Sequence, residues 1–360
     1  MNMICKPDLE KVTERFEAWW NCEIVDRPLV SIDVTPPPGP PLLKKRYDSL
    51  RERWMDTDFI LDQFETSLRG RVFLAETIPI FCPNLGPEIV STLFGAELEF
   101  GETTSWSKPV AASCFDLLKC EPDFDNRYWA WICRATDLSL QRGAGQWLTA
   151  VTDLHTNGDL AASLRTPQNL CMDLAEDLDG VAAAVERVTD YFPAIYDDLW
   201  SRIRAAGQPS TTWLPSLHTG RSYALSCDFI CMISPAMFER AILPSIVREM
   251  RFLERSLFHL DGPGALCHLD ALLACPELNG VQWVYGAGNG PAARWVPVYQ
   301  RIQTAHKCMM ILCEDIGDAE AILPQLRPEG VWLSVGGSYP LDVAQDFIRR
   351  IGEWGAHRPG

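Results

Sequence analysis

Short apolar runs and longer amphipathic stretches alternate along the last third of the chain. The apolar runs at 256–261, 280–285, 308–313 and 330–335 have the length of strands, and stretches with helical spacing of apolar residues separate them. Strands that are apolar on both faces are typical of a parallel sheet covered by helices. The pattern therefore predicts a βαβα arrangement in this part of the chain.

Four further apolar runs, at 29–34, 71–76, 147–154 and 211–217, bring the number of expected strands to about eight in 360 residues. This number favours a (β/α)8 TIM barrel, an α/β fold, over an open doubly wound sheet, because no glycine-rich dinucleotide fingerprint follows an early strand. We expect a single domain overall, with residues 1–70 as an N-terminal extension of helices and loops and residues 71–360 as the barrel. A long helix is expected from 180 to about 206.

Charge and cysteine content indicate which partners and which cellular compartment to expect for the protein. The net charge is −16, which argues against nucleic acid and anionic membrane as partners. The 13 cysteines form no Cys-x-x-Cys pair, a usage that suits a reducing compartment. No apolar run reaches membrane-spanning length, and the first residues lack the apolar core of a signal peptide. These features predict a cytoplasmic protein.

Acidic and imidazole side chains gather at the ends of the predicted strands, where a barrel places its active site. His259 and Asp261 are two residues apart on one strand, so both point to the same side, and Gly262 to Gly264 then end the run. The structural alternative is a core histidine bonded to a neighbouring aspartate. The residues expected to carry out acid–base chemistry at other strand ends are Glu76, Asp153, His155, His218 and Glu314.

Two kinds of ligand contact are expected around these groups. A metal ion such as zinc would be held by His259, Asp261 and Glu76. Ser338 follows two glycines and precedes a helix, where backbone amides can meet an anion, although an ordinary tight turn gives the same pattern. The side chains expected to contact substrate are Trp106, Trp213, Trp283, Tyr285, Arg221 and Ser338.

The sequence resembles the uroporphyrinogen decarboxylase superfamily, in particular its branch of cobamide-dependent (corrinoid) methyltransferases labelled trimethylamine corrinoid protein-like. The resemblance rests on Ile233-Ser234-Pro235-Ala236-Met237-Phe238-Glu239 through Leu243-Pro244, on His259-Leu260-Asp261-Gly262 and on Pro83-Asn84-Leu85-Gly86-Pro87. It covers most of the chain and is strongest from about 145 to 350. It implies a (β/α)8 barrel with its site in the barrel mouth.

The resemblance also implies a reaction, a cofactor and partners. The family's methyltransferases bind zinc through a His-x-Cys pair and a later cysteine. Here His259 matches the histidine, Asp261 stands at the cysteine position, and the stretch 334–338 has no cysteine. Because of this difference, we expect either a metal site with more oxygen ligands or a site without metal. The implied partners are a small methylated substrate and a protein that supplies the corrinoid, with a homodimer as a further expectation.

Two other functions stay open from the residues alone. Paired carboxylates at a barrel mouth, together with the 13 tryptophans, would suit a glycosidase or another carbohydrate-active hydrolase or lyase. The same scaffold could also bind a ligand without turning it over. No Gly-x-Ser-x-Gly elbow or P-loop is present, so acyl transfer and nucleoside phosphate chemistry have no support.

Overall fold

Six parallel strands form the central sheet of the protein. The computed structural model describes residues 3–36 and 43–356, and its sheet has the order β1-β10-β9-β8-β7-β6. The strands are β1 (Leu29–Val34), β6 (Ser222–Ser226), β7 (Arg255–Asp261), β8 (Gly280–Val284), β9 (Cys308–Cys313) and β10 (Val331–Tyr339). The edge strand β1 comes from the segment expected to be an N-terminal extension.

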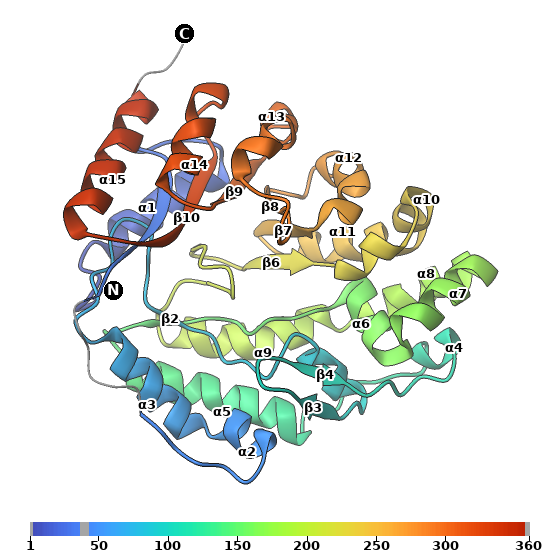
Figure 1. The fold of residues 1–360 in the computed structure, drawn as a ribbon. Coiled ribbons are helices and arrows are strands. Elements are labelled where there is room, and N and C mark those ends of the chain that lie inside the picture. Colours follow the sequence, from blue (N-terminus) through green and yellow to red (C-terminus); the bar gives the residue numbers. More distant parts are fainter. Residues whose placement is uncertain (1–2, 37–42, 357–360) are drawn as a thin grey trace.

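The βαβα arrangement expected for the last third of the chain is confirmed. Helices follow the strands from β6 to β10 and lie together on one side of the sheet (Figure 1). They are α11 (Leu243–Phe252), α12 (Leu269–Leu273), α13 (Val296–Thr304), α14 (Ile316–Ile322) and α15 (Leu341–Ala356). A short helix, α10 (Pro235–Met237), and a π-helical turn at Phe238–Ile242 lead into α11.

The first part of the chain has shorter strands and more helix. A parallel pair, β2 (Ile80–Phe81) and β5 (Leu148–Thr149), and an antiparallel pair, β3 (Leu98–Phe100) and β4 (Ser105–Ser107), lie outside the six-stranded sheet. The helices here are α1 (Leu9–Trp20), α2 (Leu50–Met55), α3 (Thr57–Leu68), α4 (Cys114–Leu117), α5 (Arg127–Arg142), α6 (Asn157–Arg165), α7 (Pro167–Glu176), α8 (Leu178–Thr189) and α9 (Phe192–Ala205). Among the described residues, none of the helices combines the length and the apolar character needed to cross a bilayer.

Some of the sequence predictions for this part are wrong. The segments 71–76 and 211–217 are not strands, and β6 was not expected. The backbone of Ala75 adopts a positive φ of 48°, which interrupts an extended run. The expected helix from 180 to 206 is two helices, α8 and α9, with Pro193 in the first turn of the second.

Backbone hydrogen bonds nevertheless connect these irregular segments to the regular strands. The Glu76 amide donates to the Val30 carbonyl at 2.9 Å, next to β1. The Val151 amide, just after β5, donates to the Thr211 carbonyl at 2.9 Å. Both segments that were expected to be strands therefore lie beside strands, although their own geometry is not regular.

The two faces of the six-stranded sheet pack against different layers. Because side chains alternate along a strand, Phe258 and Leu260 of β7 join the core beneath the outer helices. Leu257, on the opposite face, packs in a second cluster with Phe16 and Trp19 of α1. Helix α1 thus covers the face opposite to α11–α15, near the strands' amino ends.

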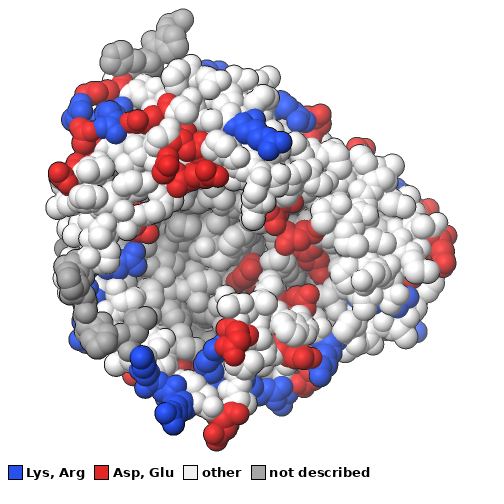
Figure 2. Space-filling view, viewed as in Figure 1, with Lys and Arg blue, Asp and Glu red and all other residues white. Residues whose placement is uncertain are grey.

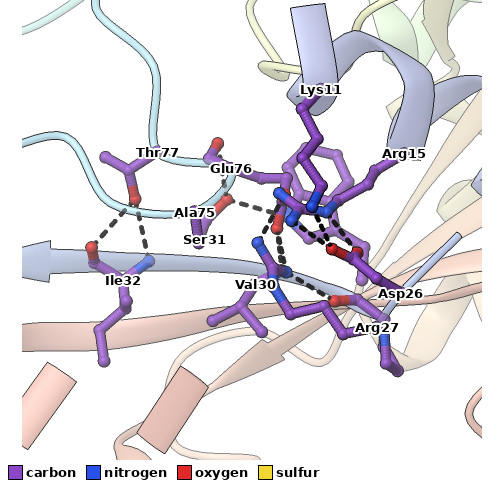
Figure 3. A network of polar contacts seen from close by, with 12 residues as sticks. Lys11, Arg15, Asp26, Arg27, Val30, Ser31, Ile32, Ala75, Glu76 and Thr77 are labelled. Atoms are coloured by element: carbon purple, nitrogen blue, oxygen red, sulfur yellow. Dashed lines mark hydrogen bonds and ion pairs between the residues drawn. The ribbon is translucent and has the colours of Figure 1, made fainter. Parts of the chain in front are cut away.

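A buried carboxylate joins the segment around Glu76 to β1 (Figure 3). Glu76 is fully buried, and both of its oxygens accept from the Arg27 guanidinium, at 2.6 and 2.9 Å. It also accepts from the Val30 amide at 2.7 Å, and Arg15 lies 3.3 Å away. Each lone pair of a buried carboxylate needs such a donor. Glu76 is thereby committed to holding two chain segments together.

Removal of the Arg27 side chain tests this role. Because a buried carboxylate would lose its bidentate partner, we expect Arg27→Ala to lower the free energy of unfolding by about 3–5 kcal/mol. Arg71→Ala is the matched control, since Arg71 pairs with Asp33 at 3.0 Å on the surface and should cost less than about 1 kcal/mol. Urea unfolding of both variants measures the difference, and equal losses would contradict the assignment.

Candidate functional site

The carboxyl ends of β6 and β7 present several polar side chains on the same face of the sheet. Ser226, His259, Gln282 and Met310 are register partners on β6 to β9, so their side chains point the same way. They lie on the face that α1 covers near the strands' amino ends, but farther along the strands. Figure 2 shows a broad hollow in the side of the molecule seen in Figure 1, with acidic groups gathered at its right-hand edge and upper rim.

Neighbouring side chains fix the ring of His259. Its Nδ1 lies 2.6 Å from the Gln282 Oε1, and the Gln282 amide nitrogen lies 3.2 Å from the Met310 sulfur. Since a carbonyl oxygen only accepts, Nδ1 donates this hydrogen bond, and in the neutral ring the lone pair is on Nε2. The indole of Trp213 meets the imidazole edge to face, with ring centroids 4.9 Å apart. The structure therefore brings Trp213 beside His259.

Two groups of side chains have the ligand types and spacing for a cation. Asp228, His259 and Asp261 offer ligand atoms that lie within 4.8 Å of one another. His155, Asp159 and Asp228 form a second group by the same measure, so Asp228 belongs to both. The pairing of His259 with Asp261, expected from their spacing, is thus seen in the structure. Neither group found among the described residues includes Glu76.

The imidazole of His155 lies between two carboxylates. Its Nε2 is 3.3 Å from Asp153 Oδ2, and its Nδ1 is 3.1 Å from Asp159 Oδ2. Burial by itself would lower the pKa of His155, but the facing carboxylates outweigh it and raise the pKa well above the usual 6.5. His155 is therefore an imidazolium ion at neutral pH. Both ring nitrogens then carry protons, so His155 is a proton donor and, in this state, not a metal ligand.

Negative charge exceeds positive charge at this site. Asp153 and Asp159 face the His155 ring, Asp228 and Asp261 lie beside His259, and no Lys or Arg of the described residues forms an ion pair with these four carboxylates. Burial raises the pKa of Asp228, and the charges of Asp159 and Asp261 raise it further. A cation would relieve this repulsion.

Several buried polar atoms at the site have no hydrogen-bond partner among the described residues. They include Asp153 Oδ1, the Ser226 hydroxyl and the indole nitrogen of Trp213. Buried polar atoms in proteins are normally satisfied, so unsatisfied ones indicate where a ligand or water binds. Together with the excess of carboxylates, they fit the binding of a cation and a small polar molecule.

Two residues expected at the site lie at the other end of the sheet. His218 and Arg221 precede β6, near the strands' amino ends. The Nδ1 of His218 is 2.9 Å from a carboxylate oxygen of Glu17 on α1, and Arg221 forms an ion pair with Asp197 of α9 at 2.9 Å. The expectation that they join His259 is corrected, because residues 211–217 form no strand that could carry them to the carboxyl ends. Their contacts hold helices against the sheet.

The remaining predicted residues are spread over several places. Trp283 is fully buried on the helix-covered face, where it packs against Trp295 with centroids 5.1 Å apart. It alternates with Gln282, so it points away from His259. Trp106 is 45% exposed on β4, outside the sheet. The indole of Trp283 is therefore not brought to the acidic group, which corrects the expectation for this residue, whereas substrate contact by Trp106 stays a prediction.

Tyr285, Glu314 and Ser338 lie at the carboxyl ends of β8, β9 and β10. The Tyr285 hydroxyl donates to the Leu312 carbonyl at 3.2 Å, and burial raises its pKa to about 12. Val284 is the register partner of Asp261, and Tyr285 is the next residue along the chain. Glu314 and Ser338 are exposed at the next two strand ends.

Sequence reasoning missed Asp159, Asp228 and Gln282. Asp228 was overlooked because β6 was not recognised as a strand, so the aspartate two residues beyond it was not read as a strand-end group. Asp159 stands four residues after His155 in the first turn of α6, and helical spacing from His155 was the signal that could have found it. Gln282 is the register partner of His259, which only the pairing of β7 with β8 reveals.

A further buried carboxyl group lies behind the acidic residues. Glu249 of α11 is 1% exposed and accepts from the Asn157 amide at 3.0 Å. Burial raises the pKa of Glu249 to about 8, and the charge of Asp159 adds to the increase. Glu249 is therefore mostly a neutral acid at pH 7.

Comparison with known proteins is informative at the level of structure. No protein-family model matches the chain, and no curated protein matches its sequence. A solved structure of a methyltransferase from Methanosarcina mazei matches with a TM-score of 0.61 and 11% sequence identity, covering 95% of this chain and 98% of that chain. At this identity the likeness concerns the fold. The α/β fold with its parallel sheet is thus also that of a methyltransferase.

The charge state of His155 can be measured directly. We expect its imidazole NMR resonances to show a pKa well above 6.5, because Asp153 and Asp159 hold the ring in the charged form. Asp159→Asn should lower this pKa, and His155→Asn identifies the resonance. A wild-type pKa at or below 6.5 would contradict the arrangement.

The protonation of Glu249 makes a second prediction. Its folded-state pKa of about 8 lies above the usual 4.5, so the folded protein holds a proton that the unfolded chain releases between these values. The stability of the wild type relative to Glu249→Gln should therefore fall by about 1 kcal/mol per pH unit as the pH rises from 4.5 towards 8. Urea unfolding across this range measures it, and Glu239→Gln, at an exposed position nearby, should show no such slope.

Proposed function

We propose that this protein is an enzyme of the uroporphyrinogen decarboxylase superfamily that transfers a methyl group between a small methylated substrate and a corrinoid held by a partner protein. The observation that carries the proposal is the convergence of Asp228, His259 and Asp261 at the carboxyl ends of parallel strands. We propose further that the segments around Glu76 and Thr211 complete a (β/α)8 barrel that includes β1. The hydrogen bonds from Glu76 to Val30 and from Val151 to Thr211 support closure.

A divalent cation such as zinc would be held by the Nε2 of His259 and by the carboxylates of Asp228 and Asp261. Asp228 takes the place that Glu76 had in the sequence-based prediction. One nitrogen and several oxygen ligands suit zinc, and the hydrogen bond to Gln282 keeps the ring in the tautomer that leaves Nε2 free. The cation, when bound, would act as a Lewis acid on the heteroatom that carries the methyl group.

The side chains around this position would bind the substrate and manage its proton. A corrinoid supplied by a partner protein would provide the electron pair for the new bond to the methyl carbon, and the heteroatom, which keeps the electron pair of the broken bond, would take a proton. The His155 imidazolium, held between Asp153 and Asp159, would donate that proton. Trp213 would form a wall of the substrate pocket beside His259.

A carbohydrate-active hydrolase is the second candidate, and the raised pKa of Asp228 favours it. Glycoside hydrolysis uses a carboxyl group with a raised pKa close to a second carboxyl group, and Asp228 and Asp261 are close neighbours. Turnover of aryl glycosides by metal-free protein, abolished in Asp261→Asn, would favour this function over methyl transfer.

Metal binding is the first test of the leading proposal. We expect metal-depleted protein to take up one equivalent of Zn²⁺ or Co²⁺ in isothermal titration calorimetry. His259→Ala should weaken binding at least about tenfold because it removes a ligand, and Gln282→Leu should weaken it by about 10–100-fold because the ring loses its orienting partner. His218→Ala is the control, since that imidazole lies at the opposite end of the sheet and should leave the affinity unchanged.

The absence of stoichiometric uptake by the wild type, or equal losses in the His218 and His259 variants, would remove the metal site from the proposal. The reaction itself is tested by incubating the metal-loaded protein with cob(I)alamin and small methylated amines, ethers and thioethers. Formation of methylcobalamin, followed by its absorption spectrum, is the expected outcome, and His155→Asn should slow it strongly.

A further inference from the structure

One buried amide joins three elements behind the acidic residues. Asn157, the first residue of α6, is fully buried, and its side-chain nitrogen donates to the Glu249 Oε2 of α11 at 3.0 Å. The same nitrogen donates at 3.1 Å to the backbone carbonyl of Ser226, which is the last residue of β6. Glu249 and Ser226 are 1% and 2% exposed, so solvent does not compete for these bonds. The amide therefore fixes α6 to both α11 and β6.

The backbone of Asn157 is held in an unfavourable conformation. Its φ is 54°, in the left-handed region, which costs energy for a residue with a Cβ although asparagine tolerates it better than most. Such conformations persist where the surroundings determine them, and they concentrate near functional sites. Here the surroundings are the acceptor oxygens of Glu249 and Ser226.

The elements that Asn157 joins carry the acidic site. Asp159 lies in the same first turn of α6, and its carboxylate accepts from the backbone amides of Asp228 and Phe229, each at 2.9 Å. Gly158 approaches the chain after β6 so closely that a Cβ there would lie 2.9 Å from the Cys227 sulfur. The distance between Asp159 and Asp228 is therefore set at this junction of α6 with β6.

The geometry points to Glu249 as a positioning residue: we propose that its Oε2, by accepting from Asn157, holds the start of α6 against the end of β6 and so sets Asp159 against His155 and Asp228. An acidic side chain in its neutral form supplies this acceptor without adding a fifth negative charge beside Asp159. The relevance of the role to catalysis rests on the proposed function, whereas the role in setting the geometry does not.

Replacement of Glu249 separates positioning from general stability. Glu249→Gln keeps an acceptor oxygen, and Glu249→Leu removes it at similar size. In metal-free protein we expect the imidazole pKa of His155, measured by NMR, to stay within about 0.3 units of wild type in the Gln variant and to fall by about one unit in the Leu variant, because Asp159 would move away from the ring. Zn²⁺ affinity should follow the same order, with about a tenfold loss only in the Leu variant.

A second variant keeps the proposal testable if Glu249→Leu does not fold. Asn157→Gly retains the left-handed backbone, which glycine adopts freely, and removes only the amide, so it should reproduce the fall in the pKa of His155. A folded Leu or Gly variant with an unchanged His155 pKa would overturn the proposal. Failure of the wild type to bind Zn²⁺ would instead count against the proposed function, because the NMR measurement requires no metal.

Discussion

The alternation of side chains along parallel strands is the constraint on which the site depends. At one level of the sheet, register brings Ser226, His259 and Gln282 side by side on the same face. The side chains at the next position along the strands, such as Trp283 of β8, point into the core beneath the outer helices. A shift of one residue in the pairing of β7 with β8 would exchange these faces and bury His259 among apolar side chains. Packing of the outer helices and formation of the site are therefore decided by the same register.

The carboxylates of this protein are found in two opposite environments. Glu76 is surrounded by donors, with a bidentate guanidinium, a second arginine and a backbone amide, so its charge is fully compensated. At the strand ends, Asp153 and Asp159 face the His155 imidazolium, and the exposed Asp228 and Asp261 lie beside His259. The first arrangement joins chain segments, and its donors occupy the carboxylate oxygens that a ligand would need. The second keeps an excess of negative charge, which a bound cation would offset.

Further side chains hold the groups that carry this negative charge. Asp228, His259 and Asp261 form the inner group, Gln282 orients the His259 ring, and Asp159 is bonded to the backbone after β6. Behind them, Glu249 and Asn157 join α11, α6 and β6. Gln282, Asn157 and the mostly neutral Glu249 contribute hydrogen bonds, so they add no further negative charge beside the aspartates.

The sequence by itself determined the regular part of the fold. Apolar runs separated by helical stretches located β7, β8, β9 and β10, and the spacing of His259 and Asp261 placed both on one side of a strand, because these features depend only on local periodicity. The acidic and imidazole groups at residues 153, 155, 259 and 261 were likewise identified as strand-end chemistry.

Only the tertiary structure decided which of the predicted groups meet. Glu76, His218 and Arg221 have the right chemistry but pair with Arg27, Glu17 and Asp197, and no local pattern reveals a partner that is distant in the sequence. Asp228 and Asp159 enter the site because α6 packs against the end of β6, and Gln282 because of strand register. Periodicity tells which way a side chain points, whereas the packing of segments far apart along the chain decides what it faces there.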